Sequence, residues 1–151
     1  MRYWMGIDPG VKGASVVLNE HLVVEEVFSF AKGDETGWLH FIEKWGDTGK
    51  ATAFLERVHS FPRMGVRSAF TFGHNFGFLR GSLMGLRVPT HLVKPVDWQT
   101  GLNLPKRKTH ADQKRRLLSL ARQTFPSTKW TLDTADAALI AMQGPRVLGI
   151  R

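Results

Sequence analysis

Near its N-terminus the sequence reads Tyr3-Trp4-Met5-Gly6-Ile7-Asp8-Pro9-Gly10, an apolar run that stops at an acidic residue and a turn. A Pro-Gly pair interrupts regular structure, so we expect a strand whose carboxyl end is Asp8. Residues 14–18 and 22–30 predict two more strands, joined by the short polar turn Asn19-Glu20-His21. This part of the chain therefore predicts a sheet that starts with antiparallel strands.

The rest of the chain alternates helices with strands. We expect helices over residues 34–45, 69–86, 109–125 and 131–142, strands over 51–58 and 91–96, and a short turn or helix over 97–104. Strands separated by helices are typical of α/β proteins. The sequence predicts an α/β fold with a mixed five-stranded sheet flanked by helices, in a single domain that spans residues 1–151.

The composition narrows the classes of protein and of site. The chain has 151 residues, of which 42% are hydrophobic, and no cysteine, so a metal would have to be held by oxygen or imidazole ligands. Its net charge of +8 favours a polyanionic partner, and we expect a nucleic acid. The sequence shows neither a signal peptide nor an apolar stretch long enough for a bilayer, so we expect a cytoplasmic protein without a membrane partner.

Four acidic residues stand where strands end or where the last helix starts. Asp8 ends the first strand and Glu56 follows the apolar run Ala53-Phe54-Leu55, while Asp133 and Asp136 lie three residues apart near the start of the helix. Each one alone has a structural explanation as a turn cap, a solvated strand end, a helix N-cap or a charge that complements the helix dipole. Taken together, however, they are placed to converge on one point.

Converging carboxylates need a cation, because without one they repel each other strongly. Hard oxygen ligands suit Mg²⁺ or Mn²⁺, which also bind substrate phosphate. Two such ions can clamp the attacking and leaving oxygens of a phosphoryl displacement. We therefore expect a metal-dependent phosphodiester hydrolase with two Mg²⁺ or Mn²⁺ ions per active site.

Three segments resemble the motif blocks of RuvC-type Holliday junction resolvases in order, spacing and context. They are Gly6-Ile7-Asp8-Pro9-Gly10, then Phe54-Leu55-Glu56-Arg57-Val58, and then Asp133-Thr134-Ala135-Asp136-Ala137-Ala138-Leu139-Ile140-Ala141. Phe78-Leu79-Arg80-Gly81 also resembles the helix that the family places between the second and third blocks. The resemblance therefore spans nearly the whole chain, and the last block is its most specific part.

This resemblance implies an RNase H-like domain that acts as a homodimer in DNA recombination and repair. Each subunit would cut one strand of a four-way DNA junction. By position, Asp8, Glu56, Asp133 and Asp136 would be both the catalytic residues and the metal ligands. The short chain, with its middle rich in Phe, Gly and Trp, looks most like phage-encoded members, so we expect it in a bacterial or phage-infected cell.

Basic side chains around these blocks are expected to contact DNA. Lys94 is read as lying at the end of a strand, where it would either face the scissile phosphate or cap the sheet. The other candidates form two groups, and each has the alternative of a solvated surface; they are Arg57, His59 and Arg63 after the second block, and Lys106, Arg107, Lys108, Lys114 and Arg115 before the third.

The resemblance is incomplete at the residue that disturbs base stacking. Many bacterial members carry a phenylalanine three residues after the second acidic residue, but this sequence has His59 there and Phe61 two positions later. Either residue could serve as the wedge, or the wedge could be absent.

Glycine recurs every fourth residue on the helix expected over 69–86, at Gly73, Gly77, Gly81 and Gly85. Glycine costs about 1 kcal/mol relative to alanine inside a helix, so close packing should offset several of them. We expect this face to pack within the chain, and the alternative is that it packs across a dimer axis.

Three other functions compete with junction resolution. An RNase H-like nuclease acting on other branched DNA or on RNA–DNA hybrid would use the same carboxylates. A non-catalytic DNA-binding scaffold has no need to gather repelling charges. A phosphotransferase of the sugar-kinase type is suggested by residues 6–10 alone, and the chain is too short for the two lobes that close over ATP.

Overall fold

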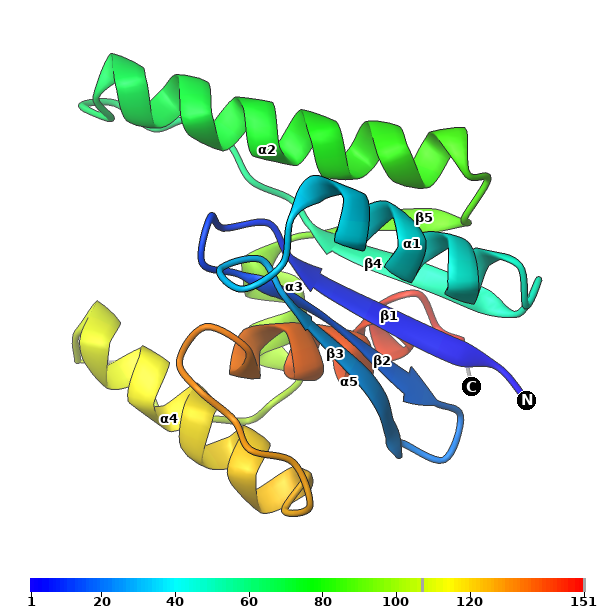
Figure 1. The fold of residues 1–151 in the computed structure, drawn as a ribbon. Helices are drawn as coiled ribbons and strands as arrows, with labels where there is room; N and C mark the ends of the chain where they lie inside the picture. Colours follow the sequence, from blue (N-terminus) through cyan, green and yellow to red (C-terminus); the bar gives the residue numbers. More distant parts are fainter. Residues whose placement is uncertain (107, 151) are drawn as a thin grey trace.

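The computed structural model describes residues 1–106 and 108–150 (Figure 1). Its elements, in chain order, are β1 (Tyr3–Asp8), β2 (Ala14–Asn19), β3 (Val24–Ser29), α1 (Glu35–Gly46), β4 (Ala51–Glu56), α2 (Val66–Gly85), β5 (Thr90–Val93), α3 (Pro95–Thr100), α4 (His110–Thr124) and α5 (Ala135–Val147). In this part of the chain, no helix combines the length and the apolar character needed to cross a membrane.

The sheet is mixed and five-stranded, with the strand order β3-β2-β1-β4-β5, which confirms the expected fold class. The first three strands form an antiparallel meander, and β4 and β5 run parallel to β1. The carboxyl ends of β1, β4 and β5 therefore meet at one edge of the sheet, toward the side from which α2 and α4 project in Figure 1.

Helices cover both faces of the sheet, because side chains alternate between the two faces along each strand. Met5, Ile7 and Leu55 point toward α1 and α2, where Trp38, Phe41 and further apolar residues complete a buried cluster. Trp4 and Phe54 point to the other face and pack in a second cluster with residues of α3, α4 and α5. Figure 1 shows α1 and α2 on one side of the sheet and α3, α4 and α5 on the other.

Helix α1 is the element that the sequence describes best. The four apolar residues expected on one face, Trp38, Phe41, Ile42 and Trp45, are all buried. The helix starts after Asp34, whose carboxylate accepts a hydrogen bond from the backbone N–H of Gly37 at 2.7 Å, as N-cap side chains do.

Several expected boundaries were wrong. Helix α2 begins at Val66, so Arg67 lies in the helix and not in the preceding loop. Strand β5 ends at Val93, because Pro95 starts α3 and Lys94 is its N-cap residue. The final helix starts at Ala135 and not at 131, because residues 131–134 form a turn.

The expected packing of the glycine face was also wrong. A Cβ added at Gly73, Gly77, Gly81 or Gly85 would meet no atom of the described residues within 4 Å, so this face of α2 is open toward that part of the chain. The reason is the helical period: Gly81 is two residues from each of the buried residues Leu79 and Leu83, so it points to the opposite side of the helix. Of the other apolar residues spaced three or four apart along this segment, Phe72 and Phe76 are half-buried and Leu86 is exposed.

Candidate active site

Two carboxylates leave the sheet side by side at the shared edge of β1 and β4. Ile7 pairs with Leu55 in the parallel ladder, and the next residues in the two strands are Asp8 and Glu56. Both are the last residues of their strands and both are partly buried. Strand pairing alone thus brings together the first two acidic residues singled out from the sequence.

Helix α5 adds a third carboxylate by crossing very close to β1. A Cβ on Gly6 would lie 2.1 Å from the carbonyl oxygen of Ala137, so only glycine permits this approach. Asp136, in the first turn of α5, is 7% exposed and lies within electrostatic reach of Asp8 and Glu56. Gly6, in the first motif, therefore allows α5, the helix that carries the third motif, to pack closely against β1.

Hydrogen bonds fix the two strand-end carboxylates. Asp8 Oδ1 accepts from the backbone N–H of Gly10 at 3.2 Å, which ties the side chain to the turn after β1. Glu56 Oε2 accepts from the indole N–H of Trp98 at 2.7 Å. Trp98 lies on α3 and is completely buried, so the packing of this helix holds the donor that orients Glu56.

Lys114 supplies the positive charge of this cluster. Its ammonium group forms an ion pair and hydrogen bond with Asp136 Oδ2, and its side chain is 32% exposed. Burial disfavours the charged form, but the charge and hydrogen bond of Asp136 and the charges of Asp8 and Glu56 outweigh it, so the pKa of Lys114 is raised. Lys114 was expected among the DNA-binding residues; in this structure it is held inside the carboxylate cluster.

The carboxylates keep their protons more readily than free side chains do. Burial, and then the charge of Asp136, raise the pKa of Asp8 above its ordinary value. Burial, and then the charge of Asp8, raise the pKa of Glu56 from 4.5 to about 7, although the Trp98 hydrogen bond works in the other direction. Mutual repulsion among these carboxylates is one cause of both shifts, and a further bound cation would relieve that repulsion.

The donor set suits a hard divalent cation, although the ligands are not assembled around one. No three Asp, Glu or His side chains among residues 1–106 and 108–150 are arranged so that they could hold a metal ion. Yet Asp136 Oδ1 is buried and has no hydrogen-bond partner among the residues that the structure describes, and the Lys114 ammonium is the cation that pairs with Asp136 Oδ2. A carboxylate cluster with an open acceptor and a displaceable ammonium fits Mg²⁺ or Mn²⁺ in its chemistry.

Asp133 is the outlying member of the expected set of four. It lies in the turn before α5 and is exposed, and the N-cap residue of the helix is Thr134. Its charge is the smallest of the influences that act on Asp8. The expected helix over 131–142 would have held both Asp133 and Asp136, but only Asp136 lies in α5.

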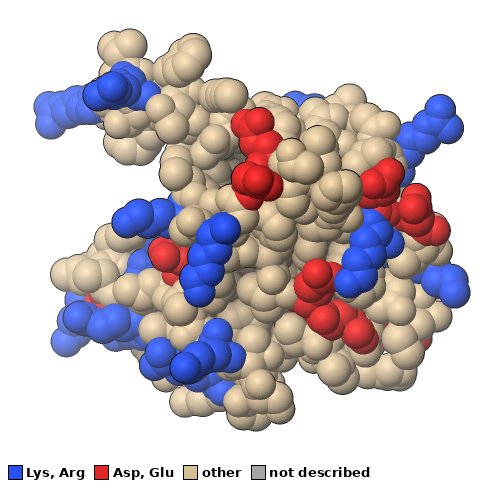
Figure 2. Space-filling view, in the orientation of Figure 1, with Lys and Arg blue, Asp and Glu red and all other residues tan. Residues whose placement is uncertain are grey.

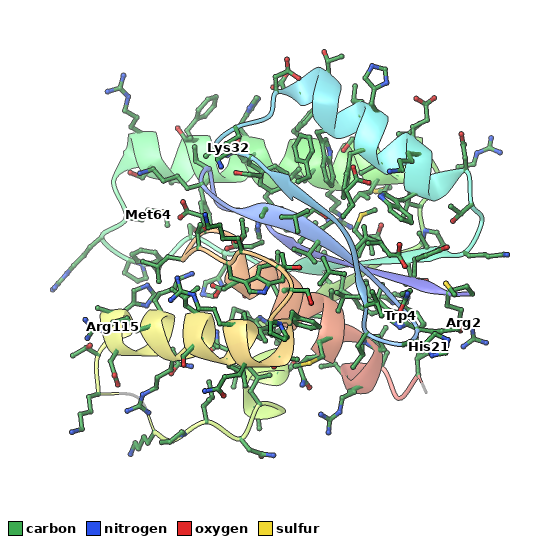
Figure 3. All side chains as sticks on the ribbon, turned by 60° about the horizontal axis from the view of Figure 1, so that its bottom comes forward. Arg2, Trp4, His21, Lys32, Met64 and Arg115 are labelled. Carbon is green, nitrogen blue, oxygen red and sulfur yellow. The ribbon has the colours of Figure 1, made fainter. Side chains whose placement is uncertain are left out.

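The cluster lies beside a hollow bordered by basic side chains. Figure 2 shows this hollow between the projecting part of α2 and α4, with Lys and Arg on both sides and acidic atoms at its base. In Figure 3, Met64 in the loop before α2 and Arg115 on α4 lie at the same end of the molecule, opposite Arg2, Trp4 and His21. The carboxyl ends of β1 and β4 are at this basic end.

The basic residues expected near DNA divide by their position. Arg57, His59 and Lys94 line a cavity of about 490 Å³ where β4 and β5 end. Arg63 is exposed in the loop before α2, as is Phe61, which is 58% exposed. Lys106, Lys108 and Arg115 are exposed on and before α4, and Arg107 lies outside the described residues.

Trp98 is a residue of the site that sequence reasoning missed. It stands in a segment read only as a turn or short helix, and nothing in its neighbourhood signals contact with a residue 42 positions away. The association of Lys114 with Asp136 was also missed, because it depends on how α4 packs against α5. In the sequence, the only hint was that Lys114 lies three residues before Leu117, which was expected on the buried side of this helix and is buried.

Comparison with solved structures identifies the fold. RuvC of Thermus thermophilus in complex with a Holliday junction substrate superposes with a TM-score of 0.63 at 15% identity, covering 99% of this chain and 95% of that one. Another T. thermophilus RuvC structure gives a TM-score of 0.58 at 14% identity, covering 97% and 96%. No family model matches the sequence, and no curated protein is detectably similar to it. The chain has the fold of RuvC Holliday junction resolvases over nearly its entire length.

Proposed function

We propose that the protein is a metal-dependent endodeoxyribonuclease that cuts four-way DNA junctions. The observation that carries this proposal is the meeting of Asp8, Glu56 and Asp136 at one edge of a RuvC-like sheet, beside a hollow bordered by basic side chains. The same fold in a RuvC structure solved with a Holliday junction substrate supports the choice of substrate.

Asp8, Glu56 and Asp136 are proposed as the core metal ligands, with Asp133 joining them from the exposed turn before α5. Mg²⁺ or Mn²⁺, two ions per site, would supply Lewis-acid activation of the phosphodiester. The open Oδ1 of Asp136 offers one ligand atom that no side chain of the described residues uses.

The protein's own residues keep the site ready. Trp98 fixes one oxygen of Glu56, so that this carboxylate is oriented before substrate arrives. Lys114 holds Asp136 and offsets part of the repulsion among the carboxylates. With a metal ion held by Asp136, the Lys114 ammonium would be free to bind a phosphate oxygen in the adjoining groove, which Lys114 also lines.

The DNA would lie in the hollow between α2 and α4. Arg57, His59 and Lys94 surround the cavity at the ends of β4 and β5, a position suited to a phosphate next to the cut. On the other side, Lys106, Lys108 and Arg115 are exposed along the approach to α4, and Arg107 is proposed with them from its place in the sequence. Arg63 adds charge to the loop before α2.

Phe61 is proposed as the wedge that disturbs base stacking. Its side chain is 58% exposed in the loop that follows Glu56, whereas phenylalanine is among the residues most often buried. Apolar side chains of this kind separate stacked bases in distorted DNA. His59 is exposed in the same loop but lines the cavity with Arg57 and Lys94, a position that favours contact with phosphate.

A second copy of the chain is proposed to pack on the open glycine face of α2. Four-way junctions have two-fold symmetry, and a C2 dimer presents two equivalent sites related by the same axis. The open Cβ positions at Gly73, Gly77, Gly81 and Gly85 allow close approach of another backbone, and Phe70 on the same helix is 77% exposed.

A substrate panel tests the proposed function. A four-way junction, a Y-fork, a linear duplex and an RNA–DNA hybrid are incubated with the protein in Mg²⁺, Mn²⁺ or Ca²⁺. We expect cleavage of the junction with Mg²⁺ or Mn²⁺ and little cleavage of the duplex. Preferred cleavage of the hybrid or the fork would move the protein to another class of RNase H-like nuclease, and tight junction binding without cleavage under any metal would make it a scaffold.

A further inference from the structure

A groove of about 720 Å³ continues from the carboxylate cluster into the space between α3 and α4. Glu56, Lys114 and Asp136 form its near end. Apolar side chains, among them Leu104 and Leu117, line its length. Clefts of roughly 300–1,000 Å³ take ligands the size of a nucleotide, so this groove is larger than metal ions alone require.

The groove wall carries a pair of glutamine amides that the proposed chemistry does not use. Gln113, on α4, is 9% exposed, and its Nε2 donates a hydrogen bond to Oε1 of Gln99 on α3 at 3.3 Å. Among the described residues, Nε2 of Gln99 and Oε1 of Gln113 have no hydrogen-bond partner. Neither atom is fully buried. The pair therefore presents a free donor and a free acceptor to the groove.

A donor and an acceptor side by side match the edge of a nucleobase. Glutamine amides read bases through such paired hydrogen bonds. The apolar lining suits the flat faces of a base, and Lys106 and His110 on the groove wall suit the charge of its phosphate. Bases next to a branch point are the least costly to unstack, because part of their stacking is already lost.

We propose that this groove takes one unstacked nucleobase of the strand that is cut, and that Gln99 and Gln113 read its edge. The protein would then prefer one base at one position near the cleaved bond. This inference rests on the proposed function and adds to it the residues that determine sequence preference. The competing explanation is that the two amides only fasten α3 to α4.

The test is a pool of four-way junctions with randomised bases around the branch point, cleaved in Mg²⁺ and sequenced. The variants are Gln113→Met and Gln99→Met, which keep the length of the side chain and remove the amide. Gln123→Met is the matched control, because Gln123 is exposed on the same helix. Thermal unfolding of each variant checks that it folds. If Gln113→Met is unfolded, Gln99→Met alone decides the test, because both substitutions break the same pair of amides.

We expect the wild type and Gln123→Met to prefer one base at one position by at least about fivefold, the low end for a paired hydrogen-bond contact. Gln99→Met and Gln113→Met should reduce that preference to less than about twofold while preferences at other positions persist. Unchanged preference in a folded Gln99→Met variant, or an unselective wild type, would overturn the inference. Failure of the wild type to cut any junction would instead overturn the proposed function.

Discussion

At the residue scale, Lys114 has the most unusual surroundings. It is the one ammonium group that the structure, over its described residues, pairs with a carboxylate of the candidate site. Asp136 is almost fully buried, so removal of Lys114 would leave an uncompensated buried charge. Lys114 is therefore expected to stabilise the metal-free protein and to compete with metal for Asp136.

Lys114→Met tests this dual effect. In EDTA the variant should lose about 2 kcal/mol of unfolding free energy, because Asp136 is left without a partner; this is below the roughly 3–5 kcal/mol of a fully buried pair because Lys114 is 32% exposed. In Mn²⁺ it should recover most of that loss, since a bound cation stabilises the folded state by mass action. Urea unfolding with and without Mn²⁺ measures both, with the neighbouring exposed residue changed in Arg115→Met as the control. Equal stability of Lys114→Met and wild type in EDTA would contradict the ion pair.

Glu56 gives a pH dependence with a defined sign. Burial, followed by the charge of Asp8, raises its pKa from 4.5 to about 7 in the folded protein. A carboxyl group with a raised pKa favours the folded state while it is protonated, so this contribution is complete below pH 4.5 and is lost as the pH rises toward 7. For this group the loss amounts to at most about 3 kcal/mol.

Glu56→Gln should remove that contribution in metal-free protein. The difference in unfolding free energy between variant and wild type should grow in the variant's favour as the pH rises from 4.5 to about 7. Urea unfolding in EDTA across this range is the measurement, and Glu43→Gln, on the exposed side of α1, is the control. A difference that stays constant with pH would show that Glu56 does not titrate in the site.

At the element scale, strand and helix patterns could be predicted where one face of an element is buried. Strands β1, β2 and β4 and helix α1 have continuous or periodic apolar residues, and the structure has them close to the expected positions. Helix α2 was harder, because its apolar residues and its glycines follow the same period on different faces. Composition cannot distinguish which of two such faces meets the sheet.

The candidate site was predictable to the extent that it follows from strand ends. Asp8 and Glu56 meet because parallel pairing places their strand ends together, which a sequence pattern can indicate. Trp98 and Lys114 join the site through the packing of α3 and α4, which no local pattern encodes. The lysine's role in particular depends on a contact across 22 residues of sequence.

Helix α2 carries the prediction about assembly. Gly77→Leu places a bulky side chain on the face proposed to meet a second copy, and should raise the dimer dissociation constant at least about tenfold. The helix itself should not suffer, because leucine has a helix propensity about 0.8–1 kcal/mol better than that of glycine. Sedimentation measures the association, and circular dichroism checks the fold.

Ser119→Leu adds the same side chain to the exposed face of α4 and serves as the matched control. It should leave the dimer intact. A Gly77→Leu protein that remains dimeric and still makes paired cuts would place the interface on another surface.

At the scale of the whole molecule, the two faces of the sheet have different tasks. Both faces carry a buried apolar core, but only the helices on the face of α3, α4 and α5 also supply side chains to the carboxylate edge, namely Trp98, Lys114 and Asp136. Lys and Arg side chains lie on the projecting part of α2 and on α4, on either side of this edge (Figure 2). Binding by these side chains and cleavage at the carboxylate edge should therefore be separable.

Cleavage and binding of a four-way junction by Asp8→Asn measure that separation directly. In Mg²⁺ the wild type should make paired cuts in opposed strands. Asp8→Asn should cut at least about 1,000-fold more slowly, because it removes a metal ligand, yet bind the junction within about threefold of the wild-type affinity, because binding rests on phosphate contacts. A variant that cuts the junction at a rate near that of the wild type would contradict the assignment of this site.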